Sequence, residues 1–557
     1  MRLRLPHAPY TLEVEMSLLG TTFRLHNKRL GFILTAILIL GLAACGGGAT
    51  EETAPATDAT PITESSDTQS EQVEQSDDQQ PERAGTLRVA MQPIVNIDPI
   101  AISSDSEVLV ANHVYDYLVD IDYLSNPVPR LATDWNVSDD GLTYTFTLAE
   151  GVTWHDGSDF SAADVVWTFD RLRTTEGAPT FDLYSNIASI EATGDLEVTF
   201  TLSNPNPFFL YDLSDNHALV LKAGTADADA NFNGTGPFVV TNYSPEDRIE
   251  MSANENYFID GQPSLAGLQI IFFNDDTAAV EALRGGQIDF AMRMSTALFE
   301  SLKAEPGIVT MDIPTNGFDL IRLRSDRAPG DDPRVIQALK LATDREAILN
   351  VVQQGYGALG NDSPIGPLYN AYHDETAVPP ARDVEAARAL MAEAGYEDGL
   401  QITLHTPDTG NRPDLAAVLK EQWSEIGVDV EISVEPESVY YADNGWLEVD
   451  LGITGWGSRP YPQFYLDVML VSDAIWNESH FSDPEFDELA AIAGTTMNEE
   501  ERVQAYADIQ KLLIERGPII IPYYFAQFGA IRDQFEGLNL KAFAGRTDFR
   551  TVTFSGN

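Results

Sequence analysis

Apolar and polar side chains alternate in two segments of the chain, which is the pattern of half-buried β-strands. These segments read LTYTFTL at residues 142–148 and LEVTFTL at residues 196–202. Between them, Ser161 and Asp164 form the start of a capping box, and apolar residues at helical spacing predict a helix to about Arg173. This part of the chain therefore mixes strands with helices.

A strand, a helix and a second strand follow one another directly farther along the chain. The strands are expected at 400–405 and 428–434, and the helix at 413–426 ends at Gly427. Such a unit gives a parallel strand pair with a right-handed crossover. Further expected elements are a strand at 86–91, helix starts at Asp332-Pro333, at Thr343 with Glu346 and at Asp383, a strand near 449–454, and a helix at 499–515. The expected fold class is α/β with more than one sheet.

A short apolar segment near the N-terminus, residues 30–44, follows Arg24, Lys28 and Arg29. It is shorter than the roughly 20 residues that a membrane-spanning helix needs. Basic residues before it and small residues at its end are typical of an export signal. We predict a signal peptide over 1–44. Because the stretch before the apolar segment is long, either Met1 or Met16 is the start.

The residues after this segment indicate a lipid anchor and a tether. Leu42-Ala43-Ala44-Cys45 resembles the lipobox of bacterial lipoproteins, and this resemblance implies that Cys45 is lipidated. The alternative is a signal anchor with an incidental cysteine. Residues 46–84 hold ten acidic residues, one arginine and no aromatic residue, so they cannot form a core. We therefore expect residues 45–84 to be a lipidated cysteine followed by a disordered acidic tether to the membrane.

Composition excludes several classes of function. The chain of 557 residues has 33 Lys+Arg against 87 Asp+Glu, a formal net charge of −54, which repels nucleic acid. The single cysteine rules out an intramolecular disulfide and cysteine-based metal sites. The sequence has no motif of serine hydrolases, zinc proteases, P-loop proteins or dinucleotide-binding enzymes, and its histidines are scattered. We therefore expect no enzyme, no metal and no cofactor.

One long segment carries a family resemblance. Residues 131–172 read LATDWNVSDDGLTYTFTLAEGVTWHDGSDFSAADVVWTFDRL, and this resembles the signature of the family-5 solute-binding proteins, the extracytoplasmic receptors of peptide and nickel ABC importers. Further similar segments follow in the order of that family: GTGPFVV at 234–240, NDDTAAVEALRGGQIDFA at 274–291, DPRVIQALKLATDREAILNVVQQGYG at 332–357, DVEAARALMAEAGY at 383–396, GWG at 455–457, PEFDELAAIA at 484–493 and RVQAYADIQKLLIERGPIIIPYY at 502–524. The resemblance covers essentially all of residues 85–557.

The resemblance implies a two-lobed periplasmic-binding-protein fold of type II, in the peptide-binding cluster, with an extra subdomain on the first lobe. Two chain crossings, near 314–324 and 518–526, would form a hinge beside a ligand cleft. The implied segments are lobe I at 85–128, its appended subdomain at 129–230, lobe I again at 231–317, lobe II at 318–519, and lobe I at 520–557.

The best candidate for ligand contact is the loop expected after the strand near 449–454. It contains Trp456, Arg459 and Tyr461, and ligands of open α/β sheets bind at such strand ends. In peptide-binding relatives, an aspartate a few residues after this Gly-Trp pairs with the peptide amine. Here the corresponding residue is Arg459, which suits a carboxylate or a hydroxyl-rich ligand. The alternative is that Arg459 pairs with a nearby acid such as Asp467.

Four further residues are weaker candidates for substrate binding. Trp446 and Tyr440 could stack on a ligand or belong to the core. Asn96 follows the strand at 86–91 and would face the cleft if the lobes are as implied. Phe318 lies on the implied hinge.

The resemblance implies an exported, lipid-anchored receptor that binds a small solute and works with the transmembrane permease subunits of an ABC importer. A peptide is the conventional solute, and an oligosaccharide or other non-peptide ligand is the rival because of Arg459. Nickel is less favoured, since no histidine cluster is visible. We expect a monomer facing a periplasm or the extracellular space. Alternatives of other classes are an exported hydrolase and a surface scaffold or sensor.

Overall fold

The computed structural model describes residues 83–556. The expected signal peptide, Cys45 and nearly all of the expected tether lie outside the described residues. Within residues 83–556, no helix combines the length and the apolar character needed to cross a bilayer.

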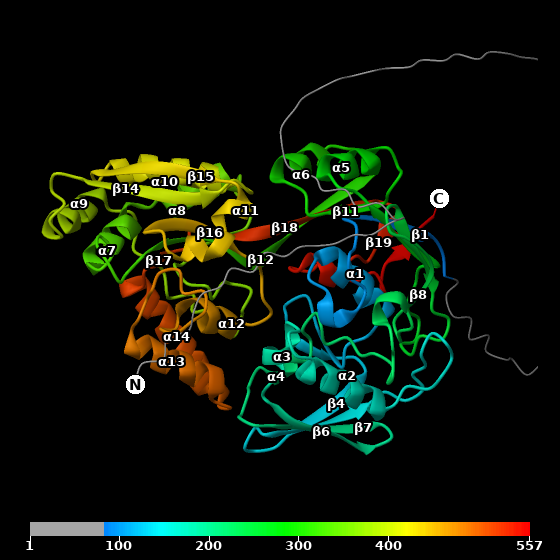
Figure 1. Ribbon diagram of the computed structural model, residues 1–557. Helices are drawn as coiled ribbons and strands as arrows, with labels where there is room; N and C mark the ends of the chain where they lie inside the picture. Colours follow the sequence, from blue (N-terminus) through cyan, green and yellow to red (C-terminus); the bar gives the residue numbers. More distant parts are fainter. Residues whose placement is uncertain (1–82, 557) are drawn as a thin grey trace, which may run out of the picture. The chain divides into compact units, whose positions relative to one another are not determined.

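A large mixed sheet runs through the described chain, and its two longest strands connect two lobes (Figure 1). β12 and β18 are antiparallel from Ile308 opposite Arg532 to Pro314 opposite Ala526, and their register then shifts before Phe318. The short strands β13 (Ala358–Leu359) and β17 (Ile519–Ile520) pair with β18 and β12. In spatial order the sheet contains β15 (Val428–Glu435), β14 (Leu400–Pro407), β16 (Leu451–Trp456), β12 (Ile308–Leu323), β18 (Tyr523–Arg532), β11 (Phe290–Met292), β1 (Thr86–Met91), β10 (Gly267–Phe272), β9 (Arg248–Ala253) and β8 (Phe238–Ser244).

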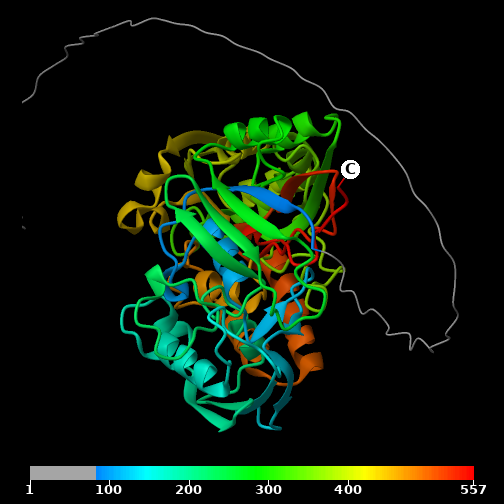
Figure 2. The ribbon, with the colours of Figure 1, turned by 90° about the vertical axis from the view of Figure 1, so that its right-hand side faces the viewer.

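Lobe I holds the part of the sheet from β11 to β8, and Figure 2 shows β1 beside the green strands of this part. β1 runs parallel to both β10 and β11, whereas β9 is antiparallel to β10. The helices of lobe I are α1 (Asp105–Val114), α5 (Asp276–Arg284) and α6 (Thr296–Leu302). Because β1, β10 and β11 point the same way, their carboxyl ends meet at one edge of the sheet.

The expected subdomain contains its own antiparallel sheet. Its strands are β4 (Ala132–Val137), β5 (Thr143–Leu148), β7 (Glu197–Leu202) and β6 (Ile187–Gly194), in that spatial order. Its helices are α2 (Ala162–Thr174), α3 (Thr180–Leu183) and α4 (Phe209–Asp212). A single hydrophobic cluster extends from Leu87 in lobe I through Phe146 in the subdomain to Val552. Lobe I and the subdomain therefore share one core.

Lobe II contains β14, β15, β16 and most of the remaining helices. One hydrophobic cluster lies around Trp423 and Leu404, and a second around Tyr506 and Phe318. These two clusters are separate from the cluster of lobe I and its subdomain, which is consistent with two lobes. The bounds of the segments that form each lobe stay a prediction. The helices are α7 (Pro333–Ala342), α8 (Arg345–Val352), α9 (Val384–Glu393), α10 (Arg412–Ser424), α11 (Glu437–Tyr440), α12 (Gln463–Tyr465), α13 (Pro484–Thr495) and α14 (Glu499–Arg516).

The remaining elements are short. Two strand pairs are β2 (Val119–Ile121) with β3 (Pro127–Pro129), and β19 (Phe535–Glu536) with β20 (Thr553–Phe554). Short helical turns are η1 (Pro99–Ala101), η2 (Ala228–Ala230), η3 (Ala442–Leu447), the π-turn η4 (Leu466–Leu470) and η5 (Ala544–Arg546).

The local patterns located most elements correctly, with two corrections. The strand–helix–strand unit is confirmed, since β14 and β15 are parallel and α10 lies between them in the chain. The helix start expected at Thr343 is wrong by one residue, because the Asp344 carboxylate accepts the Ala347 N–H and caps α8. The strand expected near 449–454 is β16 at 451–456, so Trp456 belongs to the strand and the loop begins at Gly457.

Candidate functional site

A cavity of about 250 Å³ lies where both lobes meet the crossing strands. Its walls come from the turn between β11 and α6 (Arg293–Thr296), from β12 (Asp319), from β18 (Phe525–Phe528), and from lobe II (Gln353 and Gly410–Arg412). The walls combine aromatic and aliphatic surface with a few polar and charged groups, as small-molecule sites commonly do. A solute bound here would contact both lobes at once.

The lobe II wall depends on the tight turn between β14 and α10. Gly410 has a φ of +62°, a backbone conformation that residues with a Cβ rarely adopt. The Asn411 side-chain amide donates to the Val352 carbonyl at 3.0 Å, which fixes the start of α10 against α8. The turn therefore presents Asn411 and Arg412 to the cavity.

Arg412 is held in a buried polar network at the cavity wall. Its Nε donates to Asp319 Oδ1 at 2.8 Å, and its Nη1 donates to Thr409 Oγ1 at 2.8 Å. The Tyr523 hydroxyl donates to Asp319 Oδ2 at 2.6 Å. Burial raises the pKa of Asp319 from its ordinary value, although Arg412 and Tyr523 oppose this shift. The network ties α10 to both crossing strands, β12 and β18.

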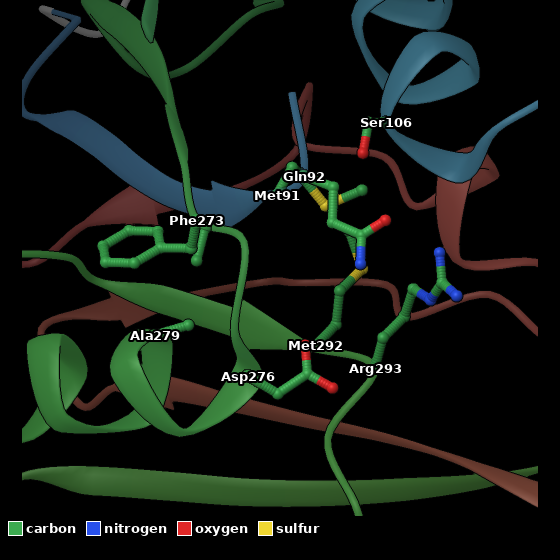
Figure 3. Close-up of a pocket in the computed structure, with 9 residues that line it drawn as sticks. Met91, Gln92, Ser106, Phe273, Asp276, Ala279, Met292 and Arg293 are labelled. Atoms are coloured by element: carbon green, nitrogen blue, oxygen red, sulfur yellow. The ribbon is translucent and has the colours of Figure 1, made fainter. Parts of the chain in front are cut away.

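A second, smaller cavity of about 50 Å³ lies at the carboxyl ends of the parallel strands of lobe I (Figure 3). Its apolar surface comes from Ala90, Met91, Phe273, Ala279 and Met292, and its polar groups from Gln92, Ser106, Asp276 and Arg293. Figure 3 shows Gln92, Asp276 and Arg293 extending from three different segments around the same space. This is the strand-end position at which α/β sheets bind ligands.

Arg293 lines both cavities and therefore links them. It directly follows β11 with a φ of +61°, an uncommon conformation for a residue other than glycine. Its Nη1 lies 2.7 Å from Asp105 Oδ2, and its side chain is 46% exposed. The guanidinium thus has one fixed carboxylate partner and further N–H groups that a solute could reach.

The structure brings Trp456 and Phe318 together, in the core of lobe II. They are register partners on β16 and β12. Phe318 is fully buried, and the Trp456 indole N–H donates to Glu478 Oε1 at 3.1 Å. Neither side chain is among the lining residues of the two cavities. A ligand contact through either residue stays a prediction that this burial does not favour.

Arg459 lies on the loop after β16, as expected, but it does not pair with Asp467, the acid that the sequence offered as the alternative to a ligand contact. Its guanidinium carbon lies 4.7 Å from the Phe464 ring centroid, and its Nη1 donates to the Ser458 carbonyl at 3.3 Å. The considered ion pair with Asp467 does not form among the described residues, since the Asp467 carboxylate accepts Gln463 Nε2 at 2.7 Å. Burial raises the pKa of Asp467 to about 6.

Tyr461 contacts the subdomain of lobe I. Its ring stacks on Phe208 at 4.9 Å between centroids with an interplanar angle of 12°. Its hydroxyl donates to Asp212 Oδ1 at 3.1 Å. The side chain expected to offer a flat face to a ligand therefore has an aromatic partner in the protein itself.

The other three candidates are not among the lining residues of the two cavities. Tyr440 and Trp446 both pack against Tyr441, at 5.0 Å and 5.6 Å between ring centroids. Asn96 lies in the loop after β1, where its backbone N–H donates to Glu107 Oε1 at 2.7 Å. Their roles in solute binding stay predictions.

Sequence reasoning missed Arg293, Asp319 and Arg412. A signal existed for Arg412, because the loop after the predicted strand 400–405 is also a strand end. No local signal existed for Arg293 or Asp319, since their places in the cavity depend on the strand order of the sheet. Among residues 83–556, no group of three or more His, Cys, Asp or Glu side chains is arranged to hold a metal ion.

Comparison with known proteins places these features in a family. Residues 126–477 match the family described as bacterial extracellular solute-binding proteins, family 5 Middle. The chain is 29% identical to heme-binding protein A of Haemophilus influenzae over 468 residues, 77% of this chain and 84% of that protein. It is 30% identical to di/tripeptide-binding protein 1 of Pseudomonas aeruginosa over 431 residues, 70% of this chain and 79% of that protein.

The fold comparison agrees with this match. The structure of HbpA2 from Haemophilus parasuis superimposes with a TM-score of 0.76 at 23% identity, covering 84% of this chain and all of that one. The expected two-lobed periplasmic-binding-protein fold is thereby confirmed. With the family match over residues 126–477, we conclude that this chain belongs to family 5 of the bacterial extracellular solute-binding proteins.

Proposed function

We propose that this protein is the extracytoplasmic receptor of an ABC importer, which captures a small organic solute between its lobes and delivers it to a membrane permease. The observation that carries the proposal is the 250 Å³ cavity, whose walls come from both lobes and both crossing strands. A hinge motion about β12 and β18, the implied crossings, would enclose a solute there. Relatives named for heme and for di- and tripeptides support a solute of this kind.

The class of solute depends on Arg459. A peptide-like solute is favoured by the di/tripeptide-binding relative. A solute without a free amine, such as an oligosaccharide, is favoured by a guanidinium at the place where peptide-binding relatives have an aspartate. A cation there would repel a peptide amine and would pair with a carboxylate or hydroxyl groups.

A thermal-shift screen of the purified chain tests the proposal and separates these solutes. The probes are di- to pentapeptides, the same peptides with acetylated amines, cello- and malto-oligosaccharides, and Ni²⁺, each at two salt concentrations. A bound solute raises the melting temperature by mass action. A shift with free-amine peptides alone would show that Arg459 does not exclude an amine. A shift with sugars or acetylated peptides alone would support the non-peptide alternative.

Arg293→Gln tests whether the two cavities form the solute site. We expect at least a ten-fold weaker solute affinity by calorimetry, because the guanidinium lines both cavities and offers charged hydrogen bonds. Arg248→Gln is the matched control, since Arg248 is also in lobe I and is also paired with one carboxylate, that of Asp247. If Arg293→Gln and Arg248→Gln bind the solute with equal affinity, the solute does not bind in the cavities that Arg293 lines.

Arg459→Ala tests the loop after β16. We expect weaker solute binding with the melting temperature of the solute-free protein unchanged, because the described structure gives the Arg459 side chain no ion pair and only one local hydrogen bond, and the backbone carbonyl that accepts the Tyr369 hydroxyl is kept in the variant. Unchanged affinity would remove Arg459 from the solute site.

Membrane anchoring through Cys45 is part of the proposal and rests on the sequence Leu42-Ala43-Ala44-Cys45. We expect cells that express the chain to incorporate a fatty-acid analogue into it, and Cys45→Ser to abolish the incorporation. Incorporation that persists in Cys45→Ser would contradict the anchor, because the chain has no other cysteine.

A further inference from the structure

A segment of the subdomain inserts into the core of lobe II. Phe208, directly before α4, is 2% exposed and belongs to the hydrophobic cluster of Phe318 and Tyr506. Its ring stacks on Tyr461, and the Arg502 guanidinium lies 5.8 Å from its centroid. In Figure 1, α4 lies at the edge of the subdomain nearest the helices of lobe II. Phe208 thus fills space in the lobe opposite to its own.

A buried carboxyl group supports the same contact from the next turn. Asp212 accepts the Tyr461 hydroxyl at 3.1 Å and Asn206 Nδ2 at 2.7 Å, and only 7% of the residue is exposed. Asp212 comes from the subdomain and Tyr461 from lobe II, so this hydrogen bond crosses between the lobes. Separation of the lobes would break it together with the Phe208 stacking.

We propose that Phe208, Asp212 and Tyr461 form an interlobe latch, which holds the subdomain against lobe II and is strengthened by acid. Two arrangements of the lobes differ in free energy by the contacts that only one of them makes. The latch supplies such contacts from the protein itself. The inference concerns the balance between the two arrangements and does not depend on which solute is bound.

The acid dependence follows from the surroundings of Asp212. Burial raises the pKa of Asp212 to about 7, the hydrogen bonds from Tyr461 and Asn206 oppose this, and the nearby Asp215 adds to it. The other charged or titratable groups facing this region include His217, which pairs with Asp215, Arg502 on α14, Asp467 on η4 beside Tyr461, and the phenols of Tyr144, Tyr184 and Tyr211. Among these groups, no cation forms an ion pair with the Asp212 carboxyl.

The direction of the pH effect is set by proton binding. In the latched form the Asp212 carboxyl keeps its proton up to about pH 7, whereas the ordinary pKa of an aspartate side chain is 3.8. Opening exposes the carboxyl to water and returns its pKa toward that ordinary value, so the open form binds fewer protons. The latch is therefore fully effective below about pH 4 and weakens as the pH rises from there to about 7, with no further change above that.

Distance measurement between spin labels on the two sides tests the latch. Ala192 on β6 and Ala491 on α13 are exposed, and replacing Cys45 by serine leaves no native cysteine in the full-length chain. We therefore label Ala192→Cys and Ala491→Cys in a Cys45→Ser background, in detergent and without added solute. The fractions of short and long distances are measured by pulsed electron paramagnetic resonance at pH 5.5 and 7.5.

In the otherwise unchanged protein, we expect the ratio of long to short distances to rise on the order of ten-fold between pH 5.5 and 7.5. Asp212→Asn, which is neutral at every pH, should keep the short distance at both pH values. Phe208→Ala should favour the long distance at both. The controls are Asp195→Asn and Phe181→Ala, exposed residues of the same subdomain, which should behave like the unchanged protein.

Two results would overturn the proposal. If Phe208→Ala has the same distances as Phe181→Ala, the inserted ring does not hold the lobes. If Asp212→Asn responds to pH as Asp195→Asn does, the Asp212 carboxyl is not the acid-sensitive group. Because no solute is present, either result leaves the proposed importer function to its own binding tests.

Discussion

Single charged residues inside lobe II are held by sets of buried partners. Arg322 on β12 is fully buried, and its Nε donates to Glu478 Oε2 at 3.2 Å. Glu478 also accepts the Thr454 hydroxyl at 2.7 Å and the Trp456 indole N–H at 3.1 Å. Removing one member of such a set leaves the others buried without compensation, which costs more than the pair itself contributes. This explains the burial of Trp456 better than a solute contact does.

Glu478→Gln is expected to lower the free energy of unfolding by about 3 kcal/mol, because the buried Arg322 loses its counter-charge. Urea unfolding followed by circular dichroism measures the change. The matched control is Glu425→Gln, which removes the partner of Arg382 in a pair whose side chains are 48% and 28% exposed. That variant should lose less than about 1 kcal/mol. Equal losses in the two variants would contradict the special cost of burial at Glu478.

At the scale of elements, the packing of β16 beside the start of α10 positions one wall of the larger cavity. Gly455 on β16 has no side chain, and a Cβ there would overlap the Arg412 guanidinium. The glycine therefore allows Arg412 to reach Asp319 on the neighbouring strand β12. The small residue Gly455 thus lets β16, the start of α10 and the crossing strand β12 pack closely at this point.

Gly455→Ala is expected to displace Arg412, to destabilise the protein by about 1–3 kcal/mol and to weaken solute binding, because overpacking at a close contact forces neighbours to move. Thermal unfolding and calorimetric titration measure the two effects. Gly457→Ala is the control two residues farther on, directly after β16, where the nearest atom to an added Cβ would be Arg459 Nη1 at 3.6 Å, an ordinary contact. If Gly455→Ala and Gly457→Ala bind the solute with equal affinity, the position of Arg412 does not matter for solute binding.

At the scale of the whole molecule, excess negative charge opposes the folded state. The formal net charge of −54 is distributed over a chain that has only 33 basic residues. Many of those basic residues are already paired in the fold, as Arg345 is with Asp362 and Arg516 is with Asp483. The remaining acidic groups repel one another over distances that salt screens.

We therefore expect the melting temperature of the solute-free protein to rise by a few degrees between low salt and about 1 M NaCl, where the screening length is roughly 3 Å. Differential scanning calorimetry measures this rise. Choline chloride at the same ionic strength should act alike, since screening does not depend on the cation. A melting temperature that stays constant or falls in both salts would contradict charge repulsion as a limit on stability.

The sequence by itself determined the local elements and the family. Alternation predicted β5 and β7, capping residues predicted α2 and α9, and the segment 131–172 carried the resemblance that the comparisons confirmed. These features depend on residues within a few positions of one another, or on a long ordered signature. Both can be read without knowing how the chain folds back.

Only the tertiary structure decided which side chains meet. Tyr461 and Asp212 are 249 positions apart, and Arg293 reaches the same cavity as Arg412 because β11 and α10 approach the crossing strands from opposite lobes. Trp456 and Phe318 became core residues because β16 pairs with β12. Strand order and the contact between lobes arise from long-range packing, which the periodicity of a single strand or helix does not encode.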